Sequence, residues 1–422
     1  MPEPVLTTLD NGLRVISEDS PDLETATVGV WVDAGARNER EELNGISHLL
    51  EHMAFKGTQR RSAQEIAEQI EDVGGHLNAY TSREQTVYVA RILKEDMGLA
   101  LDILSDILQN SVFDPEELAR EKTVILQEIG QARDTPDDIV FDHFQATAFP
   151  DQPLGRSILG TEDGVTGFGR DELIAYLAEH YRAPAMVLSA AGRVDHDLLV
   201  RQAEDLFSEL PATAPPQRAA ADYRGGVYRE PRDLEQVHFL AGFAGVAYDD
   251  PDYYTAQVYS AVLGGGMSSR LFQEIREKRG LCYAVYSFAS SYVDGGLFGV
   301  YAGTGESDMR ELLPAVAGEM AALAENVNED ETARARAQLK AGLLMSLESP
   351  PSRCEQFARQ LLIFGRVLTK AEIIGHVDRV DREAVRRYAA KVVSEPAPTL
   401  TAMGPISQLE SYGAFRARFG AS

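Results

Sequence analysis

The stretch His48-Leu49-Leu50-Glu51-His52 places two of the chain's eight histidines four positions apart, with a glutamate between them. We expect a helix over residues 43–56. In a helix successive side chains turn by about 100°, so the two imidazoles lie about 40° apart, with Glu51 on their flank. Such a pair can clamp zinc, and a neighbouring carboxylate can take a proton from metal-bound water. Two surface histidines on a polar helix face are the alternative.

A zinc site of this kind needs a third protein ligand, and Glu128 is the best candidate. It lies in DPEELAREKTVILQEIG, residues 114–130, where Asp114 suits a helix N-cap and Pro115 the first helical position. Glu121 and Glu128 fall on the stripe of this helix that is expected to be buried. The other members of that stripe are Leu118, Val124 and Ile125.

Buried carboxylates need a cation or strong hydrogen-bond donors, because an unpaired one costs several kcal/mol. Zinc bound by Glu128 would meet that need, and Glu121 could orient a histidine ligand. The alternative is that both glutamates pair with arginines, for which the candidates are Arg60, Arg61 and Arg91.

The elements around these residues occur twice along the chain. A β-type run opens each half, at residues 25–35 and 237–248, on either side of a stretch rich in Pro, Ala and Gly at 211–232 that is typical of a linker. Residues 113–121 match 327–335, and the same offset places residues 48–53 over 262–267. The pattern indicates an internal duplication.

The second copy lacks the polar residues of the first. Its counterparts of the two histidines and of Glu51 are Val262, Gly266 and Gly265, and Gly342 corresponds to Glu128. Because the same plan can be built without these polar side chains, their presence in the first copy indicates chemistry rather than architecture.

With both segments in view, the chain resembles the pitrilysin-type zinc peptidases, or inverzincins, and among them the subgroup of mitochondrial processing peptidase and its bacterial relatives. The resemblance implies that His48, His52 and Glu128 bind one zinc ion per chain. It implies that Glu51 is the general base that activates zinc-bound water. It also implies that Glu121 supports the ligands from behind.

The resemblance further implies an α+β fold of two homologous α/β sandwich domains, each a mainly antiparallel sheet packed with helices. We expect a zinc-binding domain at 1–210, a linker at 211–232 and a homologous domain without the zinc site at 233–422. Arg276 and Tyr283 lie in the second domain. Similar enzymes use an Arg–Tyr pair at this spacing to bind substrate and stabilise the oxyanion. A salt-bridged arginine and a packed tyrosine are the alternative.

Residues 76–92 have the composition of a strand hairpin, and an edge strand there could pair with an extended peptide. In the family the segment matching Asn78-Ala79-Tyr80 has this role, and Asn78 can bond the peptide near the scissile carbonyl. An ordinary sheet strand is the alternative.

The net charge of −26 argues against nucleic-acid and anionic-membrane partners, and reflects either solubility or attraction of cationic partners. No apolar run approaches the roughly 20 residues of a membrane span. The first residues resemble neither a secretory signal nor a transit peptide, and the two cysteines suit a reducing compartment. We therefore expect a cytoplasmic protein.

Together these features predict a zinc metalloendopeptidase that hydrolyses short or unfolded peptides inside a clamshell chamber. The zinc motif and the Arg–Tyr pair occur in one chain, so we expect a homodimer in which the pair of one subunit serves the zinc site of the other. The alternative from another class is a non-catalytic scaffold or partner subunit of the same fold.

Overall fold

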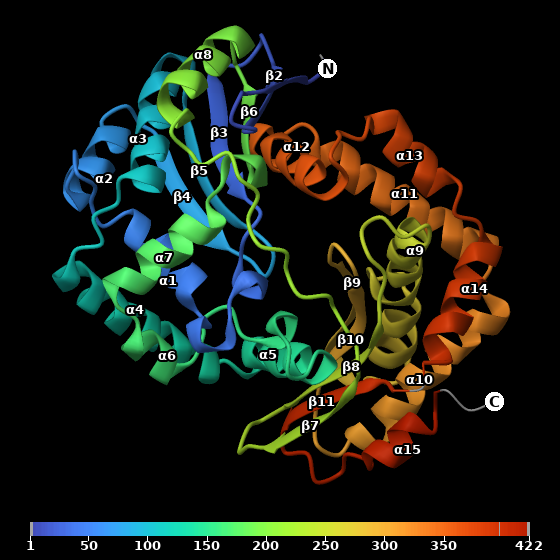
Figure 1. Ribbon diagram of the computed structural model, residues 1–422. Coiled ribbons are helices and arrows are strands. Elements are labelled where there is room, and N and C mark those ends of the chain that lie inside the picture. Colours follow the sequence, from blue (N-terminus) through green and yellow to red (C-terminus); the bar gives the residue numbers. More distant parts are fainter. Residues whose placement is uncertain (1–2, 396, 420–422) are drawn as a thin grey trace. The chain divides into compact units, whose positions relative to one another are not determined.

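The computed structural model describes residues 3–395 and 397–419, which form two compact units (Figure 1). Neither unit is continuous in sequence. Unit 1 consists of Met1–Gly130, Arg156–Ala219 and Met345–Val367. Unit 2 consists of Gln131–Gly155, Ala220–Leu344 and Leu368–Ser422.

Unit 1 is built on a sheet of six described strands in the order β1-β2-β6-β3-β5-β4, in which β2 and β6 are parallel and the other neighbours antiparallel. Its strands are β1 Val5–Thr8, β2 Arg14–Asp19, β3 Thr25–Val32, β4 His76–Thr81, β5 Thr86–Leu93 and β6 Met186–Gly192. Its helices are α1 Ile46–Ala54, α2 Ala63–Glu71, α3 Met97–Gln109, α4 Pro115–Arg133 (which continues past Gly130), α6 Glu162–Gly167, α7 Arg170–His180, α8 His196–Phe207 and α12 Pro350–Phe364.

The sheet of unit 1 is covered on both faces, which explains why β3 is buried from Ala26 to Val32 and reads as a nearly continuous apolar run. Val28 and Val30 belong to the core cluster that includes α1, α3 and α8. Trp31 points the other way and packs with Phe357 of α12.

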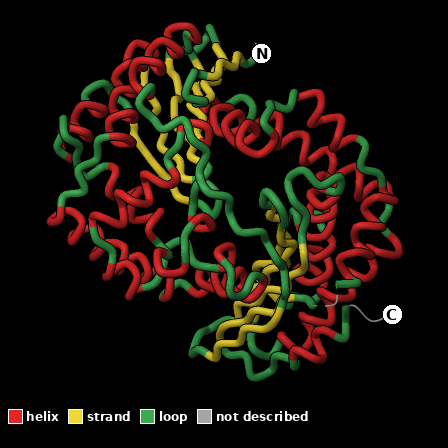
Figure 2. Tube along the Cα trace, in the orientation of Figure 1, coloured by secondary structure: helices red, strands yellow, loops and turns green. Residues whose placement is uncertain are grey.

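Unit 2 has a sheet of five described strands in the order β7-β11-β8-β10-β9, in which β7 and β11 are parallel and the other neighbours antiparallel. Its strands, yellow in Figure 2 with those of unit 1, are β7 Gly226–Pro231, β8 Val237–Ala244, β9 Cys282–Ser291, β10 Gly296–Thr304 and β11 Thr399–Gly404. Its helices are α5 Pro136–Ala148, α9 Tyr253–Gly264, a π-helix at Phe272–Lys278, α10 Met309–Asn326, α11 Glu329–Ser346, α13 Lys370–Asp378, α14 Arg382–Val393 and α15 Tyr412–Arg416.

The two sheets have the same topology. Strands β2, β6, β3, β5 and β4 of unit 1 occupy the positions of β7, β11, β8, β10 and β9 of unit 2, and β1 is an addition at the β2 edge. The predicted fold of two duplicated domains, each a mainly antiparallel sheet packed with helices, is confirmed.

The halves of the sequence exchange one helix. Helix α5 is encoded in the first half but packs on β7, β8 and β11 of unit 2 (Figure 1). There Phe144 is buried in one cluster with Leu240. Its counterpart α12 is encoded in the second half but packs on β2, β3 and β6 of unit 1. The compact units therefore differ from the continuous domains expected at 1–210 and 233–422.

The expected linker at 211–232 is partly a strand, because Gly226–Pro231 forms β7. This strand lies at the edge of its sheet and alternates between half-buried and exposed residues, so it carries no apolar signal. Upstream of it, Arg218 pairs with Asp33 in unit 1, whereas the Tyr223 hydroxyl donates to the Gly242 carbonyl in unit 2. No helix within the described ranges is both long and apolar enough to cross a membrane.

Candidate metal centre

Helix α1 carries the HLLEH motif and begins at a glycine. Gly45 is its N-cap with φ of 99°, a conformation that few other residues adopt, and a Cβ there would lie 2.8 Å from the Gly160 Cα. The helix expected at 43–56 is therefore shorter, because the left-handed residue sets its start. Leu49 and Met53 are fully buried and hold the helix against the core, which leaves the opposite side for the motif.

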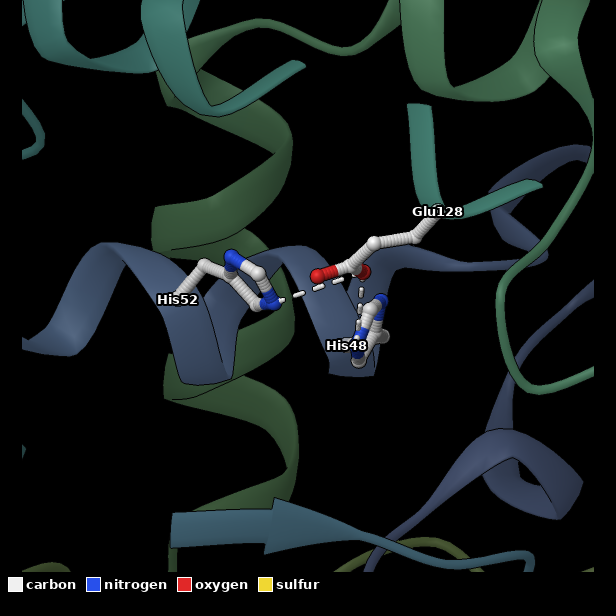
Figure 3. Close-up of side chains that lie close together, drawn as sticks. All are labelled: His48, His52 and Glu128. Carbon is white, nitrogen blue, oxygen red and sulfur yellow. Dashed lines mark ion pairs between the residues drawn. The ribbon is translucent and has the colours of Figure 1, made fainter. Parts of the chain in front are cut away.

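His48, His52 and Glu128 converge from α1 and α4, as predicted (Figure 3). The Glu128 Oε2 lies 3.7 Å from the His48 Nε2 and 3.8 Å from the His52 Nε2. One ligand atom from each residue lies within 4.8 Å of the other two. The two distances from Glu128 to the histidines are too long for hydrogen bonds but close to the about 3.4 Å between ligands of a tetrahedral zinc with 2.0–2.1 Å bonds.

The donor set fits a divalent zinc ion, since two imidazole nitrogens and one carboxylate oxygen leave a fourth position open. Burial, and then the neighbouring His52, lower the pKa of His48 to about 4. His48 is therefore neutral at physiological pH, which is the state in which an imidazole binds metal. Its Nδ1 is buried and has no hydrogen-bond partner among the described residues.

Glu121 lies against His52, where it was expected, and its role in supporting the metal ligand stays a prediction. Its side chain is only 8% exposed, and its Oε2 lies 2.9 Å from the His52 Nδ1. Its cation is Lys56, whose Nζ lies 2.7 Å from Oε1. Burial alone would raise the pKa of Glu121, but hydrogen bonds from Lys56 and His52 lower it overall.

The arginine alternative is wrong for Glu121: Arg60 and Arg61 instead pair with Asp102 and Asp106. Sequence reasoning missed Lys56, although it lies four positions after His52 and thus on the same side of the segment.

The predicted buried stripe of α4 is only partly buried. Leu118, Glu121 and Ile125 are buried, whereas Val124 is 39% exposed and the Glu128 side chain 37%. The N-terminus is as expected, since the Asp114 carboxylate accepts hydrogen bonds from the first turn. The accessibility of Glu128 suits a ligand that must share its metal with substrate.

Glu51 is held by a residue that the sequence did not single out. The Thr81 hydroxyl donates a 2.6 Å hydrogen bond to Glu51 Oε2. Burial raises the pKa of Glu51, while this hydrogen bond and His52 lower it. Thr81 directly follows Asn78-Ala79-Tyr80, so its place at the end of the hairpin's first strand was the available signal.

The hairpin predicted over residues 76–92 is formed by β4 and β5, and β4 is the edge strand of its sheet. Asn78 and Tyr80 are exposed along this edge, and Ala79 is half-buried. The strand therefore has a free edge for main-chain pairing within the part of the chain that is described, but its contact with substrate stays a prediction.

Arg276 and Tyr283 belong to unit 2, at the π-helix and the start of β9. The Arg276 guanidinium lies 4.9 Å from the centre of the Tyr283 ring and 4.5 Å from that of Phe272. Tyr283 is 78% exposed, so it is not the packed tyrosine of the alternative. The two side chains are paired, and their catalytic role stays a prediction.

Comparison with known proteins agrees with this geometry. Residues 14–162 match the family described as insulinase (peptidase family M16), and residues 167–339 match the peptidase M16 inactive domain. A probable mitochondrial-processing peptidase subunit beta of Arabidopsis thaliana is 41% identical over 99% of this chain and 81% of its own length. An uncharacterized zinc protease of Rickettsia felis is 41% identical over 92% of this chain and 94% of its own.

Two solved structures share the fold. A chain of Complex III2 from Candida albicans has a TM-score of 0.87 at 23% identity, over 98% of this chain and 99% of that chain. A peptidase M16 inactive domain from Pseudomonas fluorescens has a TM-score of 0.89 at 19% identity, over 97% and 99%. With the identity of its relatives and the HxxEH constellation in place, the chain belongs to peptidase family M16, in the group that resembles the beta subunit of mitochondrial processing peptidase.

Proposed function

We propose that the protein is a zinc metalloendopeptidase that hydrolyses short or unfolded peptides. One observation carries the proposal: His48, His52 and Glu128 bring their ligand atoms within 4.8 Å of one another, beside a carboxylate that a hydrogen bond holds in place. The zinc protease names of the relatives support the choice of metal.

In this proposal His48, His52 and Glu128 hold the metal, and Glu51 moves the proton. Zinc, when bound, supplies a Lewis acid that polarises the scissile carbonyl and makes water more acidic. Glu51 accepts a proton from water as the water oxygen attacks the carbonyl carbon. It returns that proton to the leaving amine as the C–N bond breaks. Because Thr81 occupies Oε2 of Glu51, Oε1 is the oxygen assigned to the proton.

The free edge of β4 is assigned to the substrate, which would pair with its main chain in an extended conformation. Asn78 would bond the peptide near the reacting carbonyl. We further propose a homodimer that encloses a chamber, with Arg276 and Tyr283 of one subunit stabilising the oxyanion at the zinc site of the other. Light scattering in solution tests this arrangement, and a purely monomeric species would contradict it.

A quenched-fluorescent peptide library tests the activity. Cleavage by the wild type is expected to stop with chelator and return with added zinc. Glu51→Gln should lose 10²- to 10⁴-fold in kcat, the usual contribution of general-base catalysis, and still bind one zinc per chain by elemental analysis. Glu42→Gln is the matched control, because this glutamate lies on an exposed turn.

Two outcomes would contradict the proposal. Unchanged cleavage by Glu51→Gln would remove that residue from its assigned role. No cleavage by the zinc-loaded wild type would favour a non-catalytic partner subunit.

A further inference from the structure

Helix α1 cannot cap its own N-terminus. An N-cap side chain normally accepts a hydrogen bond from the first turn, but Gly45 has none. The left-handed conformation of Gly45 and its contact with Gly160 exclude the residues with polar side chains that usually occupy an N-cap. The first amides of the helix that carries the motif must therefore be satisfied from elsewhere.

Glu39 provides that cap from outside the helix. Its carboxylate is buried, and its Oε2 accepts hydrogen bonds from the Gly45 amide at 2.8 Å and the Asn44 side chain at 2.9 Å. Its Oε1 accepts from the Ser47 amide at 2.8 Å. A negative charge at this end of a helix is also favoured by the helix dipole.

Glu39 is itself fixed to the hairpin that holds Glu51. It follows the 3₁₀ turn Ala36–Asn38, in which the amides of Ala36 and Arg37 donate to carbonyls of the β4–β5 turn at Ser82 and Arg83, 3.1 and 2.7 Å away. The buried Arg37 also pairs with Glu84 of that turn at 2.6 Å.

The hairpin is thus linked to α1 twice, once directly and once through the 36–39 segment. At the motif, Thr81 holds the Glu51 carboxylate. At the start of the helix, one turn earlier, the 36–39 segment holds the amides through Glu39. These contacts therefore tie α1 to the hairpin at two separate places along the helix.

We infer that Glu39 is a positioning residue of the metal centre, which sets the placement of His48 and Glu51 by anchoring the first turn of α1 to the β4–β5 hairpin. The inference rests on the proposed function for its catalytic consequence. Its structural consequence, a fixed metal-binding turn, can be measured without catalysis.

The test compares Glu39→Gln with Glu39→Ala and with Glu42→Gln as the control. The amide of glutamine keeps the volume and one acceptor oxygen but cannot accept all three hydrogen bonds. Zinc affinity, measured by competition with a chelator, is expected to weaken about tenfold in Glu39→Gln and further in Glu39→Ala. Hydrogen exchange of the amides at 45–48 should accelerate about tenfold, while that of α3 stays unchanged.

Two further readouts separate positioning from loss of fold. Unfolding of unit 1, followed by the fluorescence of Trp31, should keep its midpoint at neutral pH in Glu39→Gln, because burial of the charged carboxylate is itself unfavourable. In the active protein, kcat should fall about tenfold with KM within twofold, since the substrate strand is untouched.

The inference is overturned if Glu39→Gln binds zinc as tightly as the wild type does and its amides at 45–48 exchange at the wild-type rate. If the wild type itself cleaves no peptide, the proposed function fails. The affinity and exchange measurements then still decide the role of Glu39.

Discussion

Replacing Lys56 by methionine should show how much this lysine stabilises the buried Glu121 carboxylate beside the metal centre. Glu121 is almost fully buried and has two partners, Lys56 Nζ at 2.7 Å and His52 Nδ1 at 2.9 Å. Lys56→Met keeps the length of the side chain but removes the cation. The carboxylate then keeps the hydrogen bond that it accepts from His52 Nδ1.

The size of the effect follows from burial. Removing one partner of a fully buried ion pair costs about 3–5 kcal/mol. The Lys56 side chain is 31% exposed, so water partly replaces it and about 2 kcal/mol is expected. With a urea dependence of roughly 2–3 kcal/mol per molar for a unit of this size, the midpoint should fall by roughly 0.7–1 M.

The loss should depend on pH. The pKa of Glu121 is lowered in the folded protein, so its contribution to stability is present above the ordinary carboxyl pKa and is lost as pH falls through the folded value. The difference between wild type and Lys56→Met is therefore largest at neutral pH. It should shrink in acid, where the carboxyl is protonated in both proteins.

Urea unfolding of chelator-treated protein measures the effect. Trp31 is the chain's single tryptophan and is buried in unit 1, so its fluorescence reports on this unit. The matched control is Lys56→Met/Glu121→Gln, which carries no unpaired charge and should recover most of the loss. An unchanged midpoint in Lys56→Met, or the same loss in the double variant, would refute the reasoning.

Three further results are expected. Thr81→Val should lower kcat about tenfold with bound zinc unchanged, because the Glu51 carboxylate loses the hydrogen bond that holds it in place. Thr81→Ser keeps a hydroxyl and should restore the rate, and equal rates in the two variants would contradict the role of Thr81. Burial raises the pKa of Glu39 from 4.5 to about 6, so the free energy of unfolding should fall by about 2 kcal/mol as pH rises through this range. In urea titrations Glu39→Gln should remove this dependence on pH, and a dependence that persists in the variant would show that Glu39 is not its source. Phe357→Ala should destabilise unit 1 by about 3–5 kcal/mol, seen as a lower urea midpoint by Trp31 fluorescence, because this ring is fully buried against the sheet; an unchanged midpoint would contradict the packing.

The two histidine ligands could be predicted from sequence because their approach depends on local geometry. His48 and His52 need only one helical turn, and Glu128 stood out as an acid on the stripe expected to be buried. The supports could not be predicted, since Thr81 and Glu39 reach α1 only after the hairpin and the 36–39 turn are in place. Strand β7 could not be predicted because an exposed edge strand has no apolar pattern.

The exchange of α5 and α12 was hidden for another reason. The two helices hold equivalent places in the two copies, and each is amphipathic whichever sheet it covers. Their apolar faces predict that each helix packs against a sheet, but they do not indicate which of the two sheets. That assignment depends on contacts between residues far apart in the sequence, such as Trp31 and Phe357.

The exchanged helix has a consequence for synthesis on the ribosome. One face of the first sheet receives its cover only when residues 350–364 emerge, long after the last strand of that sheet at 186–192. Until then the face that carries Trp31 lacks its covering helix and is open to chaperones or to misassembly. A truncated message that ends near residue 219 would yield an incomplete product, so quality control should recognise such fragments by the bare sheet.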